Sequence, residues 1–323
     1  MAVFASGVHC AARASNSPPT FTADLAFDQI GRVLTDTPPP PPGPSPDGFA
    51  SDARRIADLP AIPKADGIMA AAEATRALGM TPLTAPAAQL GAIALGAATN
   101  AYTARATAVG KAYMQAGSMT HAWFYRGWTR LETPALHSVA ITKPDQGLEI
   151  WLDPAARTYR EKRKTVPGQD AEVYSVSAAD DVRISFDGGN APMFKTMNEA
   201  VLEGLAVRGY RTDATFSVSG TLGFCSKGSH VLSEVEYVAD VPDPQVATGP
   251  ALGGSALARE VCLPTNSGSH REPGRLVLYR AISLTGGPPY GDLVSVLERA
   301  NLRSVGAAES SLFSVPSEYK EVP

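Results

Sequence analysis

The chain has 323 residues, 44% of them hydrophobic, which is long enough and apolar enough for one large domain or two ordinary ones. It carries 28 basic and 32 acidic residues, and a net charge of −4 disfavours nucleic acid or an anionic membrane surface as a partner. Three cysteines exclude a disulfide-dense miniprotein and a cysteine-rich zinc module.

Residues 1–14 are typical of the end of a signal peptide. An apolar stretch opens the chain, and Ala12-Arg13-Ala14 matches the small-x-small pattern of a cleavage site. No basic residue precedes the apolar stretch, which a start codon placed too far downstream would explain. We expect a periplasmic or envelope protein whose mature chain begins at Ser15, with an ordinary cytoplasmic N-terminus as the alternative.

Two segments of different composition follow. Residues 15–64 contain the five-proline run Pro38–Pro42, which predicts an extended, proline-rich linker. Residues 65–116 are rich in alanine and predict a pair of helices. Their uncharged stretch, residues 77–104, contains two prolines and few large apolar side chains, so we expect no integral membrane span.

From residue 117 to the end the hydrophobic period becomes two. Leu148, Ile150 and Leu152 alternate with polar or amphipathic neighbours, and similar runs recur with turn signals between them. Roughly ten such strands predict an α+β protein built on a large curved antiparallel β-sheet. The helices of residues 65–116 are then the candidates to cover its apolar face.

A search for catalytic motifs finds no nucleophile elbow, no phosphate-binding loop and no H-E-x-x-H pair. We therefore predict no catalytic residue, no metal and no cofactor. A hydrolase using His121, or the paired acids Glu234 and Glu236, stays open as a minor alternative, although two solvated acids on an edge strand is the simpler interpretation.

An aromatic group near the start of the β region leaves a similar choice. Trp123, Tyr125 and Trp128 lie near two arginines and could stack a sugar or a base. An aromatic-rich strand of a large core explains them more simply.

Four motifs of the β region, in this order, resemble a known family. They are Tyr125–Glu132 with its R-x-E element, the Leu-Asp-Pro hairpin in Ile150–Glu161, the Gly-Tyr-x-Thr start in Gly209–Thr212, and the Leu-Phe-x-x-Pro-x-x-Tyr ending in Leu312–Lys320. Together they resemble bacterial envelope proteins related to the outer-membrane lipoprotein carriers, over about residues 117–323.

The resemblance implies a half-barrel with helices packed on its concave face and an apolar cavity between them. It favours a non-enzymatic protein that binds a hydrophobic small molecule, a lipid or a lipoprotein segment. The cavity walls that we predict carry Phe124, Ile150, Ile184 and Phe216. The alternative is a structural or protein-interaction module whose cavity is filled by its own side chains.

Two cysteines remain after the predicted cleavage site. Cys225 and Cys262 lie in separate strand-like segments, and export would expose them to an oxidising compartment. We predict a disulfide between them that stabilises the fold by roughly 3–4 kcal/mol, with two buried free thiols as the alternative.

Overall fold

The computed structural model describes residues 22, 24–35, 44, 48–60, 101–109, 112–113, 116–163, 183–186, 193–219, 228–244, 274–285 and 293–322. One helix, α1 (Gly48–Ala57), a helical stretch at 101–109, and three 3-10 helices, η1 (Pro134–Leu136), η2 (Pro144–Gln146) and η4 (Ala307–Phe313), accompany the strands in this part of the chain. The strands are β1 (Leu25–Thr35), β2 (Ser118–Tyr125), β3 (Trp128–Thr133), β4 (Ser138–Lys143), β5 (Leu148–Asp153), β6 (Thr158–Arg163), β7 (Arg183–Phe186), β8 (Met193–Thr196), β9 (Ala200–Leu202), β10 (Leu205–Ser219), β11 (Gly228–Pro242), β12 (Arg275–Thr285), β13 (Leu293–Ser304) and β14 (Lys320–Glu321).

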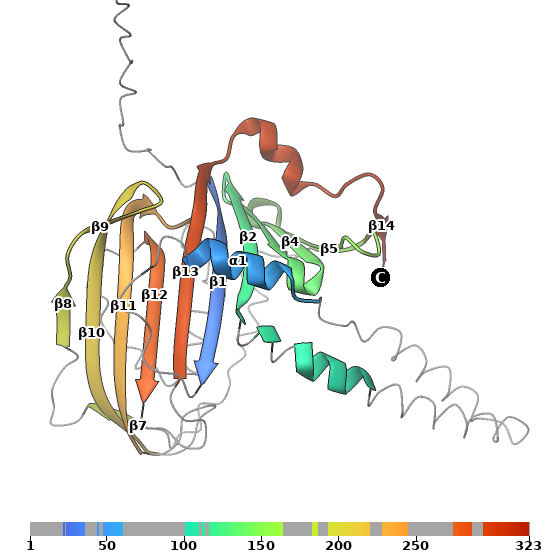
Figure 1. The fold of residues 1–323 in the computed structure, drawn as a ribbon. Helices are drawn as coiled ribbons and strands as arrows, with labels where there is room; N and C mark the ends of the chain where they lie inside the picture. The colour runs from blue at the N-terminus through green and yellow to red at the C-terminus, as the bar shows by residue number, and fades with distance from the viewer. Residues whose placement is uncertain are drawn as a thin grey trace, which may run out of the picture.

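These strands form one large open sheet (Figure 1). The order along it is β14-β6-β5-β4-β3-β2-β1-β13-β12-β11-β10-β7, and the short strands β8 and β9 also pair with β10. Neighbours are antiparallel, except that β14 runs parallel to β6. The prediction of an α+β protein with a large antiparallel sheet is confirmed.

The division of the chain at residue 117 needs a correction, because the sheet reaches back into the proline-rich segment. Strand β1 lies between β2 and β13, in the middle of the sheet. Its sequence sends Leu25 and Phe27 into one apolar cluster and Ala26 into another, as a strand buried on both faces requires. Helix α1 also falls within residues 15–64, just after the five-proline run, so this segment is not simply an extended linker.

The hairpin between β2 and β3 follows directly from its turn residues. Arg126 and Gly127 both have positive φ, 51° and 80°, which is the backbone of a two-residue type I′ turn. This turn fixes the register of β2 on β3, so that Trp123 lies opposite Arg130 and His121 lies opposite Glu132. The short turn and R-x-E element of the first motif thus belong to one tight hairpin.

The register defines two faces of the sheet. Cross-strand partners share a face, so Ile150, Ile141, Arg130, Trp123 and Ala26 lie on one side, together with Ile30. We call this the helix face, because α1 packs on it: Ile56 of α1 is buried in the same cluster as Ile30 (Figure 1). The other side, which carries Phe124, Phe216 and Glu234, is the far face.

Most of the predicted helical segment, residues 65–116, lies outside the described residues. Its end contributes the helical stretch 101–109, and Val109 and Tyr113 join the cluster under α1. Among the described helices none is long and apolar enough to cross a membrane.

Candidate functional site

The structure places three of the four predicted wall residues in the core, at separate positions. Phe124 stacks on Phe27 at 5.6 Å between ring centroids, and Phe216 stacks on His230 at 5.4 Å. Ile150 is only 3% exposed and packs in a different cluster. Ile184 lies in β7, paired with Val218, and its side chain is outside what the structure describes.

These residues do not converge on one site. Ile150 lies on the helix face, whereas Phe124 and Phe216 lie on the far face, with four strands between β2 and β10. Local alternation correctly identified Phe124, Ile150 and Phe216 as buried positions, but it carries no information about which face of the sheet a strand presents after each hairpin.

The C-terminal signature packs into the same apolar cluster as Ile150. Phe313 is fully buried, and its ring centroid lies 6.1 Å from both the Tyr125 ring and the Trp128 ring. Nη1 of Arg130 donates to the carbonyl oxygen of Leu312 at 2.9 Å, which ties this segment to β3. The Leu-Phe-x-x-Pro ending therefore seals the apolar end of the helix face with the protein's own side chains.

The aromatic residues considered for stacking are engaged within the protein. Nε1 of Trp128 donates to Asp145 at 2.7 Å, and the ammonium of Lys143 lies 4.4 Å from the centre of the Trp128 ring. The Arg130 guanidinium lies 5.6 Å from the centre of the Trp123 ring. These contacts give the rings a role in the core and in cation–π pairs.

A polar network joins three strands at the centre of the helix face. Asp28 of β1 receives two contacts: His121 Nδ1 lies 2.5 Å from its Oδ1, and Asn301 Nδ2 donates to its Oδ2 at 2.7 Å. A β-bulge produces this arrangement, because Ala26 pairs with Arg303 while Asp28 pairs with Ala300. Asn301 lies on β13 between Ala300 and Arg303. It has a φ of 57°, and its backbone N–H donates to Glu203 at 2.7 Å.

Asp28 and His121 each favour the charged form of the other side chain. Burial alone would raise the pKa of Asp28, but hydrogen bonds from His121 and Asn301 and the positive charges of His121 and Arg303 lower it. The hydrogen bond to Asp28 raises the pKa of His121 in spite of its partial burial. The two side chains are 24% and 28% exposed, so solvent only partly screens the interaction between them.

A cavity of about 190 Å³ lies beside this network, lined by Asp28, Trp123, Asn301 and Arg303 among others. Both carboxylate oxygens of Asp28 already have partners, and Arg303 pairs with Glu309 at 2.5 Å. Within the described residues no hydroxyl or thiol bonds to His121, so the nucleophile–base contact of a hydrolase is missing there. The network chiefly locks β1 to β2 and β13.

The acidic pair on β11 is buried, which corrects the picture of two solvated acids on an edge strand. β11 lies between β10 and β12 inside the sheet, and Glu234 and Glu236 are at most 7% exposed. Arg280 of β12 reaches both: its Nε donates to Glu234 Oε1 at 2.6 Å and lies 3.3 Å from Glu236 Oε1. The guanidinium compensates charge that would otherwise be costly to bury.

Two further predictions concern metals and the disulfide. No group of three metal-ligating side chains occurs in the part of the chain that the structure describes. Cys225 and Cys262 lie outside the described residues, as do the predicted signal peptide and the cleavage site before Ser15.

Comparison with known proteins adds no family to this picture. No family model matches the chain, and no curated protein matches it either.

Proposed function

We propose that this protein is a non-enzymatic protein of the bacterial cell envelope that serves as a structural or protein-interaction module. The observation that carries the proposal is the packing of Phe313 on Tyr125 and Trp128, in the same buried cluster as Ile150, which fills the apolar end of the helix face. The engagement of both Asp28 oxygens within the sheet also favours a structural role for the polar network. The envelope location rests on the leader-like residues 1–14 and on the resemblance.

A hydrophobic ligand under the helices is the second candidate. The placement of α1 supports it, since Ile56 lies against the helix face where the resemblance implies covering helices. In this second candidate function, the sheet curves into a half-barrel, the helices lie on its concave face, and an acyl chain occupies the space beneath them. Burial of about 12 methylenes would contribute up to roughly 10 kcal/mol before the costs of association.

Titration with a fluorescent fatty-acyl probe separates the two candidates. We expect delipidated, folded wild-type protein to show no saturable uptake, because the apolar end of the helix face is already filled. Phe313→Ala should create an apolar cavity beside Ile150 and gain weak probe binding. Phe216→Ala, a truncation of the same size on the far face, is the matched control and should not bind at the Ile150 side.

One result would reverse the choice between the candidates. Saturable uptake by the wild type, competed by lipid and unchanged by Phe313→Ala, would support the ligand carrier and exclude the filled module.

Intact mass of the protein expressed in its own host tests the envelope location separately: the mature chain should begin at Ser15, and retention of residues 1–14 would contradict export.

A further inference from the structure

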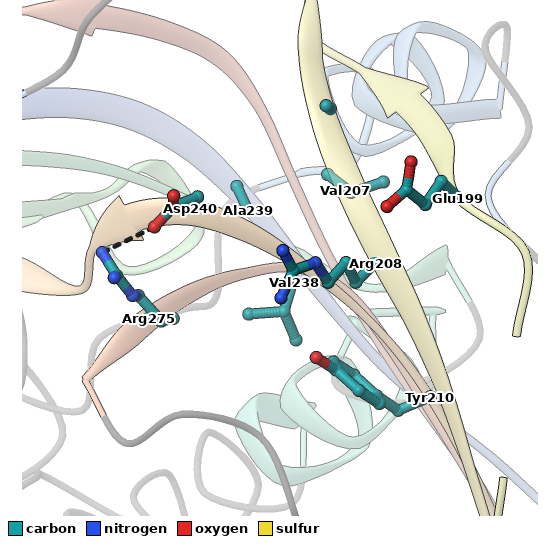
Figure 2. A pocket seen from close by; sticks show the side chains of 9 residues that line it. Glu199, Val207, Arg208, Tyr210, Val238, Ala239, Asp240 and Arg275 are labelled. Atoms are coloured by element: carbon teal, nitrogen blue, oxygen red, sulfur yellow. Dashed lines mark ion pairs between the residues drawn. The ribbon is translucent and has the colours of Figure 1, made fainter. Parts of the chain in front are cut away.

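A second pocket lies toward the β7 edge of the sheet, where β10, β11 and β12 meet (Figure 2). Its volume is about 260 Å³, and its polar lining consists of Glu199, Arg208, Tyr210, Asp240 and Arg275. Val238 of β11 and other small apolar side chains complete the wall. Such a pocket, with an apolar surface and a few polar groups, fits a small polar molecule rather than an acyl chain.

The charges around this pocket are only partly compensated. Arg275 and Asp240 pair at 2.7 Å on one side (Figure 2). The side chains of Arg208 and Glu199 also line the pocket; both residues are exposed, and within the described residues neither side chain makes a hydrogen bond or an ion pair. The pocket thus offers a ligand one solvated positive group and one solvated negative group.

The backbone beside this pocket is fixed by a close approach between two segments. The segment before β9 is tied to β10 by a hydrogen bond from the Met197 amide to the Gly209 carbonyl at 2.8 Å. It approaches so closely that a Cβ on Gly209 would lie 2.9 Å from Cβ of Met197 and 3.3 Å from the Asn198 carbonyl oxygen. This close approach explains the glycine of the Gly-Tyr-x-Thr motif and fixes the backbone next to Glu199 on one segment and next to Arg208 on the other.

The tyrosine of the same motif belongs to the pocket. The Tyr210 ring stacks on Phe194 at 5.5 Å, and its hydroxyl points toward Val238 on the pocket side (Figure 2). A hydroxyl beside a guanidinium is a suitable pair of donors for a carboxylate or a phosphate.

We propose that this pocket binds a small zwitterion. Arg208 and Tyr210 hold its anionic group, a carboxylate or phosphate, Glu199 holds its primary ammonium, and Val238 contacts the carbon atoms between or beside them. Free amino acids and phosphoethanolamine, the headgroup of a common envelope lipid, share this chemistry. The proposal is independent of whether the helix face carries an apolar ligand.

Isothermal titration calorimetry of the full chain at low salt tests it with soluble probes. The zwitterions are L-valine and phosphoethanolamine, and the analogues with charge of one sign only are isobutyrate, glycerol phosphate and ethanolamine. We expect saturable binding of at least one zwitterion, with an affinity at least tenfold higher than that of its one-sign analogues. The zwitterion that binds more tightly identifies the source as an amino acid or a lipid headgroup.

Variants assign the binding to the pocket. Arg208→Gln and Glu199→Gln should each weaken the zwitterion at least tenfold, and Glu199→Gln should leave binding of the anionic analogue unchanged or stronger. Arg211→Gln is the matched control, because Arg211 lies on the same strand, is exposed and pairs with Asp213 at 2.8 Å outside the pocket. It should bind like the wild type.

The proposal is overturned by either of two results. One is the absence of saturable binding of both zwitterions to folded wild-type protein. The other is binding that Arg211→Gln weakens as much as Arg208→Gln does, which would indicate general electrostatic attraction instead of a site.

Discussion

Two regions of the helix face are covered by the chain itself, and they are covered by different chemistry. At the β2–β6 side the C-terminal segment inserts Phe313 among aromatic rings, so the cover is apolar. At the centre α1 adds Ile56, but it is also held by Arg32, which pairs with Asp52 of α1 and with Glu298 of β13. One face of the sheet is thus sealed by apolar packing in one place and holds its covering helix by charge in another.

Removal of the aromatic cover should have the largest effect. Phe313→Ala should lower the free energy of unfolding by about 3–5 kcal/mol, because it leaves a cavity among Tyr125, Trp128 and Ile150. Urea denaturation followed by circular dichroism measures this. Leu136→Ala, a truncation of an exposed apolar residue, should cost less than about 0.5 kcal/mol. Equal losses would contradict the packed cover.

Removal of the charged attachment should have a smaller and more local effect. Arg32→Met leaves Glu298 without its cation and Asp52 with Arg55 as its remaining partner, which should cost roughly 2 kcal/mol. Burial and the Asp52 charge raise the pKa of Glu298 while Arg32 lowers it, so the variant should titrate Glu298 at higher pH. Amide exchange within α1 should accelerate more than exchange within β5, and uniform acceleration would contradict local attachment.

The polar network between these two regions should give a pH dependence of roughly 1 kcal/mol. The pKa of His121 is raised, so its contribution is complete below about pH 6.5 and is lost as the pH rises through the higher folded value. The pKa of Asp28 is lowered, so its contribution is present above about pH 4 and is lost as the pH falls through the lower folded value. Unfolding of His121→Asn at pH 5.5 and pH 8.5 should show a smaller change than the wild type; an equal change would exclude the pair as its source.

The smallest effect is expected at the exposed end of the network. Arg303 is half-exposed and pairs with Glu309 of η4 at 2.5 Å, so Arg303→Gln should change the free energy of unfolding by about 0.5 kcal/mol or less. A loss of 2 kcal/mol or more in urea denaturation would mean that η4 is attached mainly by charge rather than by the apolar packing of Phe313.

The sequence predicted the parts of this fold that have a local signal. The alternation around Ile150 marks β5, and the two-residue turn at Arg126 and Gly127 marks the β2–β3 hairpin, because both depend only on near neighbours in the chain. The Leu-Phe-x-x-Pro ending was recognised as a motif, but not as part of the apolar cluster that contains Ile150. Its partners, Tyr125 and Trp128, lie about 190 residues earlier.

What was missed depends on distant pairing. Strand β1 was hidden by the proline run that follows it, and its place in the sheet is decided by β2 and β13 rather than by its own residues. The contact of Asp28 with His121 and Asn301 arises from a bulge that no local pattern announces. The second pocket is lined by Glu199 and Arg208 from two segments that approach closely at Gly209, and that too is a property of the folded chain.

The amount of lipid bound to the protein purified from its own host tests most directly whether the helix face is filled. Native mass spectrometry, followed by extraction and lipid analysis, counts the acyl chains bound to each molecule. A filled helix face predicts the mass of the polypeptide alone, with no acyl chain in stoichiometric amount. One acyl chain per molecule, retained by wild-type protein with Phe313 in place, would contradict the filled module and identify a carrier.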